Sequence, residues 1–205
     1  MKHLALLGAA VGGVLLIFCL MSPGCLGPNP KPCTEPIIFN KPARVGVVAF
    51  RNNSGVYGSG WDTKTYTATM ITTGLGKKRD FRIFERQQLS KVIAEQKLNP
   101  LQNPETAVKI GNLTGVQLLV VGTITSINQQ RVPTPAGKAG GMMVTVDFKA
   151  IDAETGEIKI NGRASDFALG VVLENGLRLP SPGKRAFRKV GDKVASKLDK
   201  CVKVA

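Results

Sequence analysis

The chain has 205 residues, enough for one domain with a buried core and an N-terminal export segment. Lysine and arginine number 28 against 14 acidic residues, so the formal net charge is +14. This balance indicates either an anionic partner (nucleic acid, an anionic membrane surface or an acidic polymer) or basic faces that are only solvated. Aromatic residues make up 5% of the chain, too few for a platform that stacks bases along a groove.

The N-terminus has the layout of a bacterial secretory signal, with a short basic start and an apolar run over residues 4–21. Cys25, shortly after this run, resembles the cysteine of a lipoprotein signal, which is lipidated and becomes the mature N-terminus. Ordinary cleavage and an uncleaved anchor remain alternatives, because the run approaches the roughly 20 residues that span a bilayer. Leu26 in place of an aspartate favours the outer membrane. We expect residues 1–24 to be a signal peptide and a lipid to hold the chain at the periplasmic face of the outer membrane.

Export also permits disulfides. Of the four cysteines, Cys19 lies in the apolar run and Cys25 is the proposed lipidation site, which leaves Cys33 and Cys201. We predict one bridge between these two, with two free thiols as the alternative. The chain has no C-x-x-C pair, so a zinc ribbon or a thioredoxin-like redox site is unsupported, and we expect neither metal nor cofactor.

The only histidine, His3, would leave with the signal. The remaining chain would have no imidazole for a Ser–His or Cys–His pair or for a histidine metal site. We therefore expect a protein that is not an enzyme.

The first part of the mature chain begins with proline-rich residues 25–43, which predict a tether. Residues 44–50 are nearly all apolar, as in a central strand covered on both faces. Residues 51–60 are rich in Asn, Ser and Gly and predict a loop, which is a candidate binding site because it follows a central strand. Residues 61–75 predict a helix.

A short strand over residues 81–84 turns directly into a helix that starts near Arg86 and ends at Asn99-Pro100. Glu85 stands at the junction, where a carboxylate can accept the unpaired amide N–H groups of the first turn and face the positive end of the helix dipole. We predict that Glu85 and Arg86 fix this strand–helix junction and are not catalytic.

Asn103 is placed to cap a further helix that Gly115 ends. The elements expected after it are read from apolar runs, alternation and turn residues. They are a long central strand over 116–127, a loop over 128–141, a hairpin of 144–150 with 158–160, and a second tight turn at 175–176.

Residues 184–204 predict a closing helix with one apolar stripe and a basic remainder. Its basic side is a candidate contact for an anionic partner, against the alternative of a solvated face. The candidate residues are Arg185, Arg188, Lys189, Lys193 and Lys197. Taken in order, the elements predict an α/β fold with a mixed sheet and helices packed on it, over residues 44–205.

Four stretches, in this order and together with the signal, resemble the family of curli production assembly/transport components, the CsgG-like proteins. They are residues 45–50, 84–89, 115–123 and 152–158. The resemblance implies a CsgG-like periplasmic domain with an anticodon-binding-domain-like layer fold. It also implies a non-enzymatic role in secretion or assembly of surface structures at the outer membrane, with envelope or secretion-system proteins as partners, and it is compatible with a homo-oligomer.

The same fold recurs in lipoprotein activators of penicillin-binding proteins, so an activator or binding module for cell-wall synthesis is the alternative function. Export argues against nucleic acid as a partner. In the curli secretion channel, two hairpins inserted in this domain cross the outer membrane. Residues 128–141 lack the alternation that such strands need, and residues 167–179 are short and carry Glu174 and Arg178. We therefore expect that this protein does not form the pore itself.

Overall fold

The structure, a computed structural model, describes residues 33, 35–48, 50–56, 62–99, 103, 105–135, 137–170 and 181–205. The chain divides into Met1–Pro30 and Lys31–Ala205, and every described element belongs to the second unit. The elements are β1 (Ile37–Phe39), β2 (Ala43–Val47), β3 (Arg51–Asn52), α1 (Thr63–Gly76), β4 (Phe81–Ile83), α2 (Arg86–Glu95), α3 (Glu105–Thr114), β5 (Leu118–Thr134), β6 (Gly137–Asp152), β7 (Ile158–Leu169), α4 (Pro182–Cys201) and β8 (Val202–Val204). The tight turn predicted at 175–176 lies outside the described residues.

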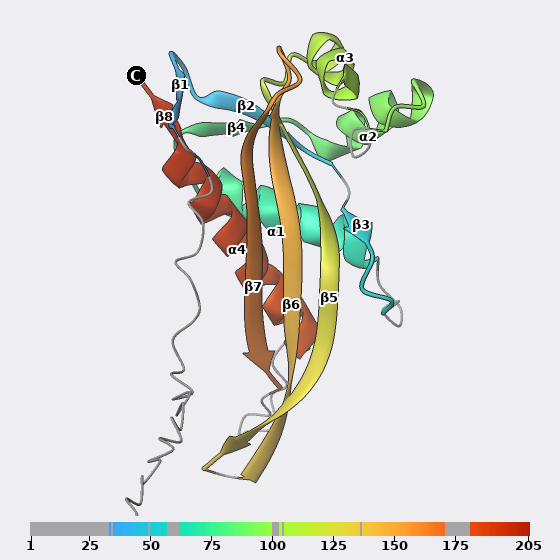
Figure 1. Cartoon of the computed structure of the whole chain (residues 1–205), viewed down its shortest axis with the longest axis vertical. Coiled ribbons are helices and arrows are strands. Elements are labelled where there is room, and N and C mark those ends of the chain that lie inside the picture. The colour runs from blue at the N-terminus through green and yellow to red at the C-terminus, as the bar shows by residue number, and fades with distance from the viewer. Residues whose placement is uncertain are drawn as a thin grey trace, which may run out of the picture. The chain divides into compact units, whose positions relative to one another are not determined.

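The main sheet has the strand order β4-β2-β5-β6-β7, with β3 beside β5 (Figure 1). β2 runs parallel to both β4 and β5, whereas β5, β6 and β7 are antiparallel to one another. The predicted α/β fold with a mixed sheet is thus confirmed, and so is the hairpin that turns at residues 152–156.

The loop predicted over residues 128–141 is wrong, because β5 and β6 pair from Leu118↔Asp152 to Thr134↔Gly137, with one register shift between Ile124 and Ser126. Local composition had indicated a loop, but the ladder of backbone bonds to a neighbouring strand outweighs weak strand propensity. Glycine is even required at one place, since a Cβ on Gly141 would lie 2.2 Å from the Phe167 ring. The hairpin therefore extends well beyond the part of the sheet that sequence periodicity reveals.

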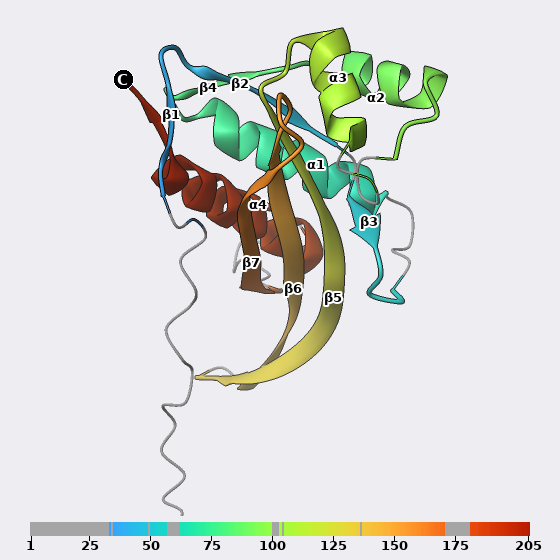
Figure 2. The same cartoon turned by 45° about the horizontal axis from the view of Figure 1, so that its top comes forward.

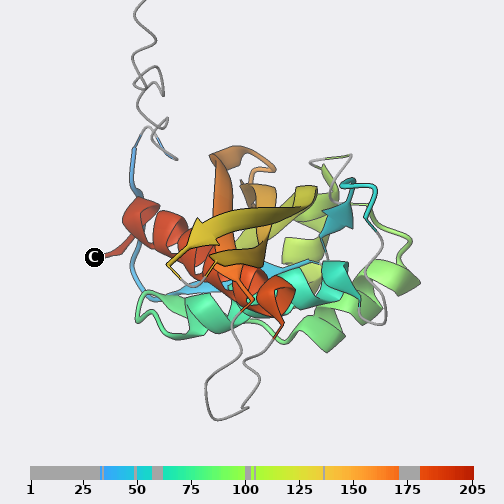
Figure 3. The same cartoon turned by 90° about the horizontal axis from the view of Figure 1, so that it is seen from below.

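The two faces of the sheet bury alternate residues, as strand geometry requires. On one face Val120, Val146 and Ile160 join the larger core. α1 and α4 lie side by side and cover this core (Figure 3). On the other face Leu119 and Val121 join a small core under α2 and α3, which lie together at one end (Figure 2).

α1 and α4 approach closely because each has a glycine at the contact. A Cβ on Gly74 would lie 2.9 Å from the Ala195 Cβ, and one on Gly191 would lie 2.7 Å from the Met70 backbone. Two ion pairs of 2.9 Å, Lys77–Asp192 and Lys78–Asp199, join the C-terminal end of α1 to α4. α1 and α4 therefore form one layer that packs against the sheet.

The ends of α2 and α3 agree only in part with the ends predicted from the sequence. The Glu105 N–H donates to Asn103 Oδ1 at 2.9 Å, as predicted, and Gly115, at a φ of 66°, ends α3. Leu113, an apolar residue of α3, is 58% exposed. α2 stops at Glu95, four residues before the predicted end, and its C-terminal turn passes through a left-handed residue, Lys97.

The C-terminal helix is also shorter than predicted. α4 ends at Cys201, and Val202–Val204 form β8, which pairs in parallel with β1. Two of the three residues of β8 are β-branched valines, which favour a strand once a partner strand is available. β1 itself falls within residues 25–43, so part of the predicted tether range is ordered against the C-terminus.

Candidate functional site

The strand–helix junction lies where the sequence predicts it, but its contacts differ. Glu85 is the N-cap of α2 with extended backbone, yet its side chain makes no capping hydrogen bond. The predicted capping role is therefore wrong, and the reason is physical: short side chains such as Asp or Ser reach the first-turn amides, whereas Glu is one methylene longer. Arg86 instead donates from Nη1 to the Thr65 carbonyl at 3.1 Å, which ties α2 to α1.

The loop after β3 is organised by one side chain. Asn52 donates from Nδ2 to the Val56 carbonyl at 3.0 Å and to Thr63 Oγ1 at 3.1 Å, and its Oδ1 accepts the Ser54 N–H. The loop start is thereby fixed to the first turn of α1. The remainder of this candidate, residues 57–60, lies outside the described residues.

The basic residues of α4 divide into two groups. Lys189, Lys193 and Lys197 donate from Nζ to main-chain carbonyls of β7, at 3.0, 2.8 and 2.6 Å respectively. Arg188 is exposed, whereas Nε and Nη2 of Arg185 are buried and have no hydrogen-bond partner in the described part of the chain. The candidate anion-binding side is therefore not one uniform surface, since three of its lysines bind the sheet.

Asp166 of β7 faces this lysine row. Its Oδ2 lies 2.8 Å from Lys193 Nζ, its Oδ1 lies 3.6 Å from Lys189 Nζ, and Oδ1 accepts the Phe167 N–H at 2.7 Å. Burial acts to raise the pKa of Asp166, but the hydrogen bonds from Lys193 and Phe167 and the charges of both lysines outweigh it, so the pKa lies below its ordinary value. Burial, followed by the charges of Lys193 and Lys200, lowers the pKa of Lys197.

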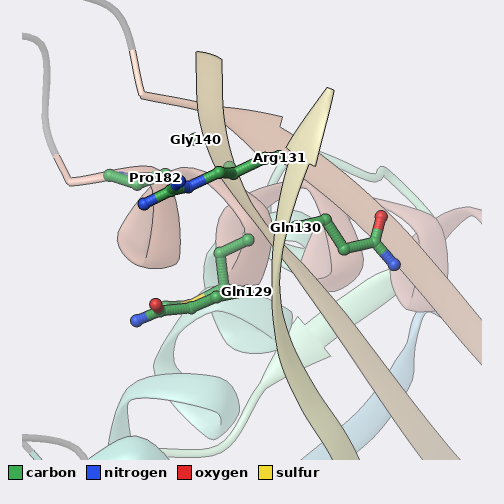
Figure 4. A pocket seen from close by; sticks show the side chains of 7 residues that line it. Gln129, Gln130, Arg131, Gly140 and Pro182 are labelled. Atoms are coloured by element: carbon green, nitrogen blue, oxygen red, sulfur yellow. The ribbon is translucent and has the colours of Figure 1, made fainter. Parts of the chain in front are cut away.

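A cavity of about 530 Å³ lies near the far end of the β5–β6 hairpin, beside the start of α4. Gln129 and Arg131 extend to the same side of β5 as Pro182, with the Arg131 side chain reaching toward Pro182, and Gln130 extends to the other side (Figure 4). The described residues that line the cavity are Gln129, Gln130, Arg131, Gly140, Gly141, Met142 and Pro182. A guanidinium, amide groups and an apolar thioether side chain can together hold a ligand with a carboxylate and a nearby apolar group.

Sequence reasoning missed this cavity because its hairpin residues fell in the expected loop. Charged and amide residues in a loop carry no sign of which other segment they will meet. The only available signal was the Gln-Gln-Arg run directly after a long apolar strand, which marks a strand continuing out of the core.

The structure joins Cys33 to Cys201 by a disulfide, with 168 residues of sequence separation between them. Cys201 is fully buried at the end of α4, directly before β8. The bond and the β1–β8 pairing therefore hold the first described residues to the last turn of the C-terminal helix.

In the part of the chain that the structure describes, no group of three or more His, Cys, Asp or Glu side chains could hold a metal ion. Among the helices formed by these same residues, none has the length and hydropathy to cross a membrane.

A family model described as the curli production assembly/transport component CsgG matches residues 39–166, more than half of the chain. The chain belongs to the CsgG family. The resemblance identified from the sequence is thus confirmed. This membership supports a role in the bacterial cell envelope.

Three solved structures are among those similar to this CsgG-family chain. The PelC dodecamer from Paraburkholderia phytofirmans is 14% identical, with 80% of this chain and 94% of that chain covered and a TM-score of 0.47. Lipoprotein GNA1162 from Neisseria meningitidis is 16% identical over 78% and 97%, with a TM-score of 0.46. The LpoB C-terminal domain from Salmonella enterica is 18% identical over 62% and 84%, with a TM-score of 0.43. The comparison with curated protein sequences returned no significant match.

Proposed function

We propose that this protein is a non-enzymatic lipoprotein of the cell envelope that takes part in secretion or assembly of surface structures at the outer membrane. The family match over residues 39–166 is the observation that carries this proposal. A family whose description names assembly and transport acts by contact with other envelope proteins, and such contact needs no catalytic group. Envelope or secretion-system proteins are the proposed partners.

The proposed anchor is a lipid on Cys25 that holds the domain at the periplasmic face of the outer membrane. Intact-mass analysis of the protein extracted from a bacterial envelope tests it, with Cys25→Ala as the matched variant. We expect a diacyl or triacyl mass that disappears in Cys25→Ala. A cleaved chain without lipid, or an uncut chain, would contradict the anchor and leave the family role standing on its own.

The partner-binding site that we propose is the cavity at the far end of the hairpin. Arg131 supplies a charge for an acidic side chain, the amide of Gln129 can pair with a peptide group, and Met142 offers an apolar contact. The volume of about 530 Å³ lies in the range of sites that hold a small ligand or a few side chains. The cavity thus suits an acidic segment of an envelope protein.

Site-specific cross-linking in intact cells tests this site, with a photoreactive residue in place of Gln129. We expect Arg131→Ala to reduce the cross-linked secretion component at least tenfold. Lys149→Ala, which removes an exposed cation elsewhere on β6, should leave it unchanged. Equal loss in both variants would mean that only overall charge matters. A cell-wall synthase as the cross-linked partner would instead support the activator of cell-wall synthesis.

The absence of a pore-forming role remains part of the proposal. Residues 128–141 belong to β5 and β6, but they still lack the alternation of apolar and polar side chains that a membrane strand needs. Asn128, Gln129, Gln130 and Arg131 are four consecutive polar residues, all exposed, on a strand whose side chains alternate between two faces. A strand that crosses a membrane keeps one of its two faces apolar.

A further inference from the structure

Among the strands that the structure describes, β7 pairs with β6 alone and so forms one edge of the main sheet. An edge strand presents a row of backbone N–H and C=O groups that another chain can bind, and a strand of 12 residues is a long edge. Alternate residues of a strand direct these groups to the same side. The side opposite to β6 carries the carbonyls of Arg163, Ser165 and Phe167, because lysines of α4 reach all three.

The spacing of the lysines fits the spacing of these carbonyls. Lys189, Lys193 and Lys197 are four residues apart and so lie along one side of α4. Four helical residues rise about 6 Å, and two strand residues rise about 6.8 Å. The helix can therefore place one ammonium on each outward carbonyl over three successive steps. Lys189 meets the carbonyl of Phe167, and Lys197 meets that of Arg163.

Asp166 keeps two of these ammonium groups in place. It lies between Lys189 and Lys193, and its side chain is 17% exposed, while both lysine side chains are more than half exposed. The lysine chains thus cross the open edge in the position where the backbone of an added strand would run.

We propose that Lys189, Lys193 and Lys197 close the edge of β7 to strand addition, and that the strand they exclude is β7 of a second copy of this chain. The occupant follows from the register. In an antiparallel pair centred on Ser165, Arg163 would stand opposite Phe167 of the other copy, and Ala164 opposite Asp166. No like charges would meet, and a cation would face an aromatic ring. Removal of the lysines would therefore leave a self-complementary edge.

Disulfide trapping in the bacterial envelope tests this proposal on the full chain, with Ser165→Cys as the reporter. Two directly opposite residues have Cα atoms about 5.5 Å apart, within the range that a disulfide bridges. The reporter is placed in three backgrounds: the native lysines, the triple replacement Lys189→Met, Lys193→Met and Lys197→Met, and the same three positions changed to arginine. Thr145→Cys on the central strand β6 is the matched control position.

We expect at least a tenfold larger fraction of disulfide-linked dimer in the methionine background than in the native background. Arginine still donates hydrogen bonds, so that background should stay low, and Thr145→Cys should give little dimer throughout. The proposal is overturned if the native background cross-links as well as the methionine one. It is equally overturned if the methionine background gives no dimer while the Cys33–Cys201 bond forms and the domain resists protease. If the triple variant does not fold, Lys193→Met alone opens the central carbonyl and should give a smaller increase; no increase there contradicts the proposal.

Discussion

The two faces of the main sheet are covered to different extents. On one face, α1 and α4 bury three fully enclosed phenylalanines, Phe50, Phe148 and Phe187. On the other, α2 and α3 cover a small cluster around Leu119 at one end, and the rest of the face shows partly exposed polar groups such as Thr145. The first face therefore provides most of the stability of the domain, and the second keeps part of its polar side chains accessible in the structure described.

The largest expected effect is at the centre of the first face. Phe187→Ala should lower the free energy of unfolding by about 3–5 kcal/mol, because the ring is fully buried and its loss leaves a cavity. Denaturant unfolding followed by circular dichroism measures this change. Phe84→Ala, a half-buried ring beside the second core, is the matched control and should cost clearly less; equal losses would contradict the comparison.

Loss of the disulfide should have the next largest effect. Cys201→Ser removes a cross-link that closes a long loop and should cost about 2–4 kcal/mol. Thermal unfolding with and without reductant measures it, and Cys33→Ser should give the same loss. Reductant should lower the native protein to the level of the variants. A native protein indifferent to reductant would show that the bond contributes little.

A substitution in the small core of the second face should destabilise α2 and α3 without destabilising α1 and α4. Leu89→Ala removes the one buried side chain of α2 and should cost about 2–3 kcal/mol. Native-state hydrogen exchange should show faster exchange in α2 and α3 while α1 and α4 keep their protection. Uniformly faster exchange across both faces would mean that the two cores unfold as one unit.

The smallest effect concerns Asp166, and it depends on pH. Its pKa is lower in the folded state, so its contribution is complete above the ordinary carboxyl pKa of about 4 and is lost as the pH falls through the lowered value. Asp166→Asn should cost about 1 kcal/mol at pH 7, and the difference from the native protein should vanish at the lowest pH. Glu154→Gln, at an exposed position of the turn that follows β6, is the control. A difference that stays constant with pH would contradict the assigned cause.

Sequence reasoning succeeded where the pattern was local and strong. The apolar run of β2, the turn at residues 152–156 and the apolar stripe of α4 each depend on neighbours in the sequence. It failed where the deciding partner is distant. From the sequence alone, residues near Gln130 resemble a loop and Val202 resembles the end of a helix. In the structure both are in strands, because β6 pairs with the first and Ile37 of β1 pairs with the second.

The candidate site shows the same limit. The sequence identified the lysines of α4 as a basic side, because their spacing along a helix can be read from one segment. It could not reveal that Lys193 meets Ser165, since that contact joins two elements through the order of strands in the sheet. The hairpin cavity depends on three segments and was missed for the same reason.

The Cys33–Cys201 bond also sets a length. Eight residue steps separate Cys25 from Cys33, and an extended chain covers at most about 3.5 Å per step, or about 28 Å in all. With the proposed lipid on Cys25, the C-terminal turn of α4 can move no farther than this from the bilayer surface. A strand of 17 residues such as β5 measures about 58 Å at 3.4 Å per residue, twice that reach. The end of the domain that carries the disulfide would therefore stay near the lipid headgroups, whichever partner the hairpin binds.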